Sequence, residues 1–141
     1  MYRIIYLSSS VEYLGGQEIE YLLAQSRKKN LEKDITGVLM YIEGDFLQVI
    51  EGPKIAVFDL FESIKKDIRH KGIITIVNTK IDKRYFPKWN MGFCISDYEE
   101  LRKIEGYENI SIETLSKITD KMAIAFINSF LNSHRNKMVF V

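Results

Sequence analysis

Residues 35–42 read Ile-Thr-Gly-Val-Leu-Met-Tyr-Ile, residues 43–45 read Glu-Gly-Asp, and residues 46–51 read Phe-Leu-Gln-Val-Ile-Glu. The first and third segments are rich in β-branched and aromatic residues, which favour strands. The three residues between them are typical of a tight connection, so the stretch predicts a β-hairpin. Gly52-Pro53 ends the second strand, because proline has no N–H to donate to a ladder.

Strands and helices flank this hairpin in a regular order. Alternating or β-branched patterns predict strands, and apolar residues spaced three or four apart predict helices. We therefore expect a strand at 2–8, a loop from Ser8 to Gly16 and a helix at 17–29 before the hairpin. After it we expect a helix at 54–69, a strand at 73–79 and a last strand at 89–95. The order β-α-β-β-α-β plus one strand is that of an α+β, ferredoxin-like sandwich. Its helices cover one face of a mainly antiparallel sheet.

The last third of the chain has a different character. Residues 97–104 and 111–132 are predicted to be helical, and an apolar stripe runs from Ile112 to Phe126. We therefore expect a domain at 1–95 and a helical extension at 96–141, which either packs on the open sheet face or mediates output. Packing is favoured, because a naked sheet face would be a large apolar patch.

The bulk composition is that of an ordinary globular domain. The 141 residues are 46% hydrophobic and 28% charged with a net charge of +1, so no overall field recruits nucleic acid or a membrane. Cys94 is the only cysteine, which excludes an internal disulfide and favours a reducing compartment. Neither a signal peptide nor a membrane helix is predicted, and we expect a soluble, cytoplasmic protein.

Several catalytic motifs are missing from the sequence. It contains no Gly-x-Gly-x-x-Gly, no Walker loop and no Ser/His/Asp pattern. His70 and His134 lie far apart and lack companions at metal-ligand spacing. Metalloenzyme and nucleophilic functions are therefore disfavoured, and no bound metal is expected.

Two polar residues occupy positions where apolar ones are usual. Tyr6 shares a strand face with Ile4, and Gln48 lies between Phe46 and Ile50 on one face. A buried amide without partners costs roughly 1–3 kcal/mol, and its donors and acceptor exchange places if it flips. On these two residues alone, a hydrogen-bonded core pair is favoured over a site for a flat ligand between the helices.

Six ordered segments taken together resemble one family. They are Arg-Ile-Ile-Tyr-Leu-Ser at 3–8, Ser-Arg-Lys-Lys-Asn at 26–30, Ile-Thr-Gly-Val-Leu at 35–39, Phe-Leu-Gln-Val-Ile-Glu-Gly at 46–52, Asp-Ile-Arg-His at 67–70 and Arg-Tyr-Phe-Pro-Lys-Trp-Asn-Met-Gly-Phe at 84–93. This order and spacing resemble the BLUF family of blue-light sensors that use FAD. The resemblance covers about residues 1–95, and Asn90 stands where the family commonly has serine.

The resemblance implies a role for each matching residue. Tyr6 matches the redox-active tyrosine and Gln48 the switching glutamine, while Trp89 and Met91 match the Trp-x-Met pair that signals beyond the flavin. The implied flavin contacts are Tyr6, Ser26, Arg27, Lys29, Asn30, Gln48, Asp67, Arg69 and His70. From the residues alone, Asn30 is favoured as a plain helix cap and the basic residues as solvated helix faces. The resemblance adds, as an equal alternative to solvation, that some of Arg27, Lys28, Lys65, Lys66 and Arg69 meet the flavin's phosphates.

The function implied is that of a non-enzymatic photoreceptor. It would bind FAD without a covalent bond, with FMN and riboflavin as alternatives, and signal through a hydrogen-bond rearrangement around Tyr6 and Gln48. Output would pass to an unknown protein partner, and a homo-oligomer is expected. The rival hypotheses are a light-independent flavin oxidoreductase and a ferredoxin-like binding module without flavin.

Overall fold

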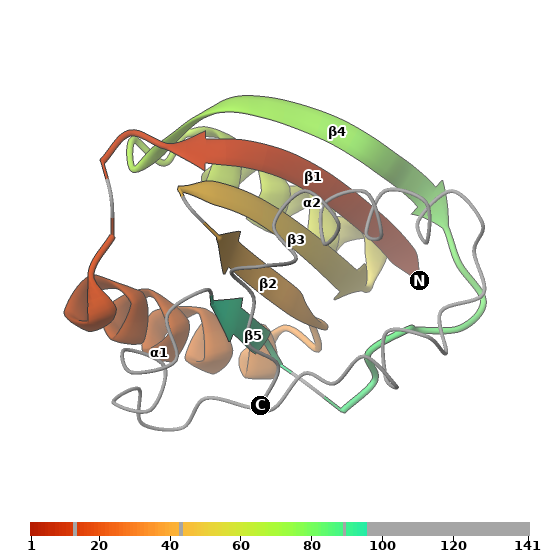
Figure 1. Cartoon of the computed structure of the whole chain (residues 1–141). Coiled ribbons are helices and arrows are strands. Elements are labelled where there is room, and N and C mark those ends of the chain that lie inside the picture. The colour runs from red at the N-terminus through yellow and green to blue at the C-terminus, as the bar shows by residue number, and fades with distance from the viewer. Residues whose placement is uncertain (13, 43, 89, 96–141) are drawn as a thin grey trace.

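Residues 1–12, 14–42, 44–88 and 90–95 are described by a computed structural model, which contains one five-stranded sheet (Figure 1). Its elements are β1 (Tyr2–Ser10), α1 (Gly16–Glu32), β2 (Thr36–Ile42), β3 (Asp45–Gly52), α2 (Lys54–Lys65), β4 (His70–Lys80) and β5 (Gly92–Ile95). The strand order is β4-β1-β3-β2-β5. The first three neighbouring pairs are antiparallel and only β5 runs parallel to its neighbour β2, which confirms the ferredoxin-like order with one added strand.

Both helices pack on the same face of the sheet. Ile19 and Leu23 of α1 join Val57 and Phe61 of α2 in one core cluster, together with alternate residues of β1, β2 and β3. In Figure 1, α2 lies behind β1 and β3, and α1 lies toward the β5 side of the sheet. Tyr6 belongs to this cluster. The helices therefore cover the face from which the Tyr6 side chain projects, as expected.

The predicted hairpin is confirmed. β2 and β3 pair from Thr36 opposite Glu51 to Ile42 opposite Asp45. Gly37 leaves no room for a side chain: its φ is 154°, and a Cβ added there would lie 1.8 Å from the carbonyl oxygen of Val49. A larger residue at position 37 would push the hairpin strands apart, so the glycine in Ile-Thr-Gly is a packing requirement.

Two predicted boundaries in the α2–β4 region were wrong. The helix expected at 54–69 ends at Lys65, and Ile68, which had been counted as a core position, is 89% exposed. The Asp67 carboxylate accepts a hydrogen bond from the backbone N–H of Arg69, which stabilises a turn in place of a further helical turn. β4 then begins at His70, three residues earlier than expected.

Two strand ends also differ from the prediction. Ser9 and Ser10 were expected in a loop, yet β1 runs to Ser10, because Ser9 pairs with β3 and both serines pair with β4. Pairing on both sides outweighs the low strand propensity of serine. The last strand was expected from residue 89, but it begins at Gly92.

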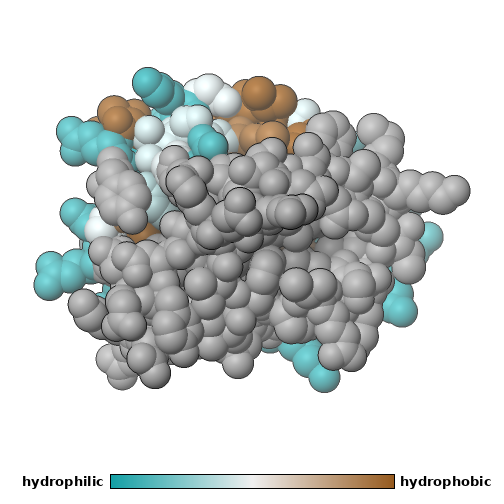
Figure 2. Space-filling view, viewed as in Figure 1, coloured by the Kyte–Doolittle hydropathy of each residue, from teal (hydrophilic) through white to brown (hydrophobic). Residues whose placement is uncertain are grey.

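β4 forms one edge of the sheet and has a mixed surface. Its residues are mostly exposed, including Ile74 at 62%, with lysines at positions 71 and 80 near its ends. In the space-filling view, apolar and hydrophilic atoms lie side by side along the upper rim, where Figure 1 places β4 (Figure 2). Charged residues on an edge strand oppose pairing with a second sheet.

Some predictions fall on other parts of the chain. Trp89 and the extension at 96–141, with its two predicted helices and its apolar stripe, lie outside the described residues. Within the described ranges, neither helix is long and apolar enough to cross a membrane.

Candidate functional site

Tyr6 and Gln48 are direct partners across the β1–β3 ladder. Their side chains are 4% and 7% exposed, and the Tyr6 hydroxyl donates a hydrogen bond to Gln48 Oε1. On its other side, Gln48 Nε2 lies 3.4 Å from the sulfur of Met91, which is fully buried. The amide is therefore held between a phenol and a thioether, and sulfur is a weak acceptor.

A cavity opens beside this pair. It contains about 570 Å³ of empty space, part of which is open to solvent. Its lining combines two kinds of residue: the apolar Leu14, Leu22, Leu39, Phe46, Leu60 and Ile64, and the polar Tyr6, Ser26, Asn30, Gln48, Asp67, Arg69 and His70. Apolar walls with polar groups at several edges suit a flat ring system that has its own polar edges.

One group of polar lining residues comes from α1. Ser26 and Asn30 are one helical turn apart, so they lie on the same side of α1. Asn30 is 2% exposed, and its Nδ2 donates to the carbonyl oxygen of Asn90, 2.7 Å away. Asn30 is thus anchored to the segment just before β5, and its amide oxygen remains an acceptor at the cavity.

The other group follows the end of α2. Asp67 and Arg69 form a close ion pair there, with Arg69 Nε 2.9 and 3.0 Å from the two carboxylate oxygens. His70 is fixed through both ring nitrogens: Nδ1 lies 2.8 Å from Ser8 Oγ and Nε2 2.5 Å from the carbonyl oxygen of Ile64. These contacts hold the polar turn at the mouth of the cavity.

Burial and charge control the protonation of this site. Burial raises the pKa of Tyr6 well above its ordinary value, and the Asp67 carboxylate raises it further. Tyr6 is therefore a neutral phenol at physiological pH, with its proton directed at Gln48. The hydrogen bond from Arg69 lowers the pKa of Asp67, which keeps that carboxylate ionised.

The remaining residues expected at the site lie farther from the cavity. Arg27 is partly buried, and its Nε donates to the carbonyl oxygen of Met91 at 3.0 Å, so it holds the start of the last strand. Lys29 is exposed and does not line the cavity. Lys28 and Lys66 are exposed, and Lys65 pairs with Glu62.

Several lining residues were not singled out from the sequence. The apolar walls look like ordinary core positions, and no sequence signal distinguishes them from the rest of the core. Ser8, which contacts the ring of the lining residue His70, was also missed, although strand alternation places it on the same face as Tyr6. Among the described residues, no group of three or more His, Cys, Asp or Glu side chains could hold a metal ion.

Comparison with known proteins links this geometry to a family. The model for the BLUF family, sensors of blue light using FAD, matches residues 1–92. A photoactivated adenylate cyclase subunit beta from Euglena longa is 29% identical over 89 residues, which are 62% of this chain and 10% of that protein. The blue light- and temperature-regulated antirepressor BluF of Escherichia coli K12 is 29% identical over 88 residues, which are 62% of this chain and 22% of that protein.

Solved structures show the same fold. The dark-state structure of BlrB, a BLUF protein, superposes with a TM-score of 0.68 at 27% identity and covers 94% of this chain and 95% of that one. The ground state of BlsA gives 0.68 at 27% identity, with 92% and 87% covered. The chain spans only about a tenth of the cyclase subunits it matches, so the match is to their BLUF region. From the family match over residues 1–92, and with a hydrogen-bonded Tyr–Gln pair lining the cavity, the chain belongs to the BLUF family, sensors of blue light using FAD.

Proposed function

We propose that this protein is a blue-light photoreceptor that binds FAD non-covalently and converts light into a hydrogen-bond rearrangement around Tyr6 and Gln48. The observation that carries the proposal is the buried chain from Tyr6 through Gln48 to Met91, in which Tyr6 and Gln48 line the cavity. When bound, the flavin supplies the absorption of blue light and an excited state that accepts electrons.

Tyr6 is the proposed electron and proton donor. Its phenol is neutral, buried and already hydrogen-bonded to an acceptor, so a proton can leave along an existing hydrogen bond. Gln48 is the proposed switch, because its amide carries an acceptor toward Tyr6 and a donor toward Met91. Rotation or tautomerisation of that amide exchanges these roles and changes which groups face the cavity.

The other polar residues would hold the cofactor in place. Ser26 and Asn30 offer a hydroxyl and an amide to the polar edge of a flavin ring. Asp67, Arg69 and His70 also line the cavity, and the sugar chain and phosphates of FAD would lie beside them. FAD is proposed over riboflavin because the Arg69 guanidinium is a suitable partner for phosphate.

Output is proposed to pass through protein contacts. The relative from Escherichia coli is named an antirepressor, and other relatives are named photoactivated adenylate cyclase subunits. The present chain would play the sensor part, with no catalysis of its own, and affect a separate protein partner or a second copy of itself.

The test is an absorption spectrum of the purified protein before and after blue light. A flavin spectrum with a small red shift that reverses in the dark supports the proposal. A flavin that only bleaches or does not respond contradicts it. A flavin reduced at useful turnover by added nicotinamide supports an oxidoreductase instead, and a colourless protein that FAD does not restore supports a binding module.

The variant Gln48→Leu sharpens this test. It should keep the flavin and lose the red shift, because leucine has the volume but not the amide. Gln25→Leu is the matched control, since Gln25 is exposed on α1 and bonds only to Tyr21 among the contacts found, so the shift should persist. A normal shift in Gln48→Leu would overturn the role given to Gln48.

A further inference from the structure

A second buried polar pair connects the same two strands. Arg3 and Glu51 are register partners in the β1–β3 ladder, three positions from Tyr6 and Gln48. An offset of three residues places them on the other face of the sheet. Arg3 is 3% exposed and Glu51 fully buried, with Arg3 Nε and Nη2 each 2.9 Å from Glu51 Oε2.

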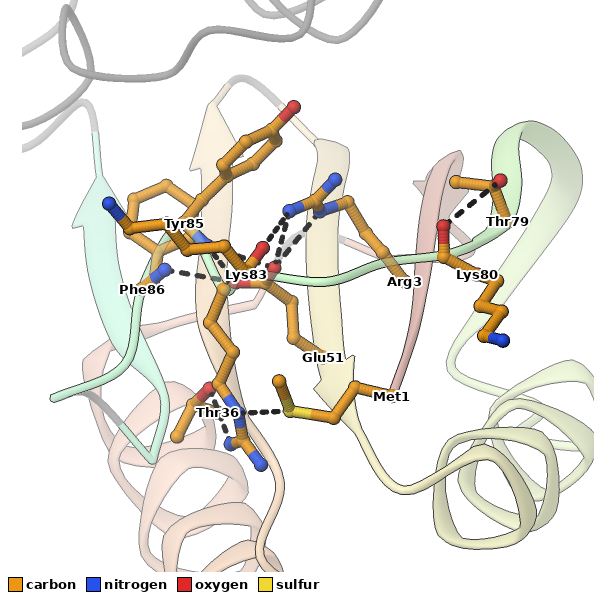
Figure 3. A network of polar contacts seen from close by, with 10 residues as sticks. Met1, Arg3, Thr36, Glu51, Thr79, Lys80, Lys83, Tyr85 and Phe86 are labelled. Atoms are coloured by element: carbon orange, nitrogen blue, oxygen red, sulfur yellow. Dashed lines mark hydrogen bonds and ion pairs between the residues drawn. The ribbon is translucent and has the colours of Figure 1, made fainter.

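This pair also holds the segment that leads from β4 to β5. Glu51 accepts hydrogen bonds from the backbone N–H groups of Tyr85 and Phe86, at 2.9–3.0 Å. Arg3 donates from Nη2 to the carbonyl oxygen of Lys83 at 3.0 Å, and its guanidinium lies 3.3 Å from the centre of the Tyr85 ring. In Figure 3 the Arg3 and Glu51 side chains point toward each other, with residues 83, 85 and 86 gathered around them.

The same segment is fastened nearby to the start of β2. Arg84 Nη1 donates to Thr36 Oγ1 at 3.0 Å, and Arg84 Nη2 lies 3.0 Å from an Asp34 carboxylate oxygen. Asp34 has a positive φ of 57° and is 74% exposed at its side chain, so this contact is weaker than the buried pair. Residues 83–86 are thus attached to β1, β2 and β3 by polar contacts.

Met91 lies five residues beyond this anchor. Its sulfur contacts the Gln48 amide, and its carbonyl oxygen accepts from Arg27. Gln48 and Glu51 are on one strand, β3. The same strand therefore carries the switch, Gln48, and the residue that anchors the segment leading to Met91. We define the clamp as Arg3, Glu51 and the backbone of residues 83–86.

We propose that this clamp positions Met91 against Gln48, and that Arg3 and Glu51 are positioning residues for the return of the light-activated state to the dark state. The inference rests on the proposed photoreceptor function. Light changes the hydrogen bonding of the Gln48 amide and removes its contact with the Met91 sulfur. Since residues 83–86 stay fixed to the sheet, Met91 is kept near Gln48. The contact between the Gln48 amide and the Met91 sulfur therefore re-forms quickly in the dark.

The test measures the rate of dark recovery of the red shift in the full chain. The double variant Arg3→Met with Glu51→Leu removes both charges at similar volume and leaves the N–H groups of Tyr85 and Phe86 without their carboxylate. We expect it to bind flavin, to show a red shift of normal size, and to recover at least about threefold more slowly than the unmodified protein. A recovery rate equal to or above that of the unmodified protein would overturn the proposal.

A control separates positioning from loss of stability. Val49→Ala truncates a fully buried side chain of β3, on the same sheet face as Glu51, without removing a polar contact to residues 83–86. It should lower the melting temperature while leaving the recovery rate close to normal. If Val49→Ala slows recovery as much as the double variant does, the clamp acts only through stability and the proposal fails.

The same measurements distinguish this failure from failure of the proposed function. Absence of any red shift in the unmodified protein would reject the photoreceptor function itself. A normal shift there, with unaltered recovery in the double variant, would reject only the clamp. Because the double variant risks misfolding, Arg3→Lys provides a second test: it keeps a positive charge for Glu51 but loses the stacking on Tyr85, and should slow recovery less than the double variant. A recovery rate in Arg3→Lys equal to that of the unmodified protein contradicts the proposal, even where the double variant does not fold.

Discussion

Two polar pairs lie three positions apart on the same two strands, and their chemistry differs. Tyr6 and Gln48 are neutral and line a cavity, while Arg3 and Glu51 are charged and lie on the opposite sheet face. Glu51 receives hydrogen bonds from one guanidinium and two backbone N–H groups. Gln48 has one strong partner, the Tyr6 hydroxyl, and one weak partner, the Met91 sulfur.

This difference separates a fixed contact from one that can change. A buried charge with every lone pair occupied has no alternative arrangement of similar energy, so the Arg3–Glu51 pair holds a geometry. A neutral amide with a weak second partner can rotate at the cost of about one ordinary hydrogen bond, roughly 1 kcal/mol. One β-ladder thus carries both a switch and a fixed support.

Breaking the charged pair from one side should have the largest effect on stability. Arg3→Met leaves the Glu51 carboxylate buried without its counter-charge, and we expect a loss of about 3–5 kcal/mol in the free energy of unfolding. Burial already raises the pKa of Glu51 and so opposes its ionised form. Urea denaturation measures this loss, and the double variant with Glu51→Leu should regain only part of it, because the N–H groups of Tyr85 and Phe86 remain without their acceptor. A loss below about 1 kcal/mol would show that the pair is not buried as described.

Breaking the Tyr6–Gln48 pair should lower the stability less than breaking the charged pair, but it should remove the light-induced red shift. Tyr6→Phe deletes one hydrogen bond and leaves Gln48 Oε1 unpaired, a loss of about 1–2 kcal/mol. The red shift should be absent, because phenylalanine cannot donate a proton. Denaturation and light-minus-dark spectra on one sample check both effects. A retained red shift would refute the role of Tyr6 whatever the stability.

The raised pKa of Tyr6 predicts a specific dependence on alkaline pH. Its pKa in the folded protein exceeds the unfolded value of about 10, so its contribution to stability is complete below that pH and is lost as the pH rises toward the folded pKa. The stability difference between the unmodified protein and Tyr6→Phe should therefore shrink above about pH 10. The red shift should persist up to that pH. Its disappearance near pH 8 would show that Tyr6 ionises more easily than its burial indicates.

The surface pair at the cavity mouth should give the smallest effect. Arg69→Ala removes an exposed partner of Asp67 and should change the unfolding free energy by less than about 1 kcal/mol. If Arg69 meets the phosphates, the variant should bind FAD about fivefold more weakly, equivalent to ~1 kcal/mol, with riboflavin affinity unchanged. Lys71→Ala, which removes an exposed charge that does not line the cavity, is the control. Equal losses for FAD and riboflavin would argue against a phosphate contact.

Local sequence patterns were sufficient to predict the pairing of Tyr6 with Gln48, but they were insufficient to predict the clamp. The alternation of Phe46, Gln48 and Ile50 placed an amide on an apolar face, and the ladder then put Tyr6 directly opposite. Arg3 and Glu51 also occupy strand positions, but a charged residue in a strand usually faces solvent. Their burial depends on residues 83–86, which reach them from a distant part of the chain.

The helix boundary after α2 shows the same limit. Ile68 continues the helical spacing of apolar residues, which is why it was expected in the core. The competing signal was Asp67, whose short side chain bonds to the backbone two residues on. A local side-chain contact outweighed periodicity there, and the same turn placed Asp67, Arg69 and His70 at the cavity.

The position of β5 at the edge of the described sheet has a consequence for background signalling. Among the described strands, β5 pairs only with β2, so hydrogen bonds to a single neighbouring strand oppose its detachment there. Local opening at such a margin requires less free energy than global unfolding, and its amide protons should exchange with solvent faster than those of β3. Each opening would move Met91, the residue just before β5, away from Gln48 without the absorption of light. The rate at which the sensor is activated in the dark would then depend on how often this edge of its sheet opens.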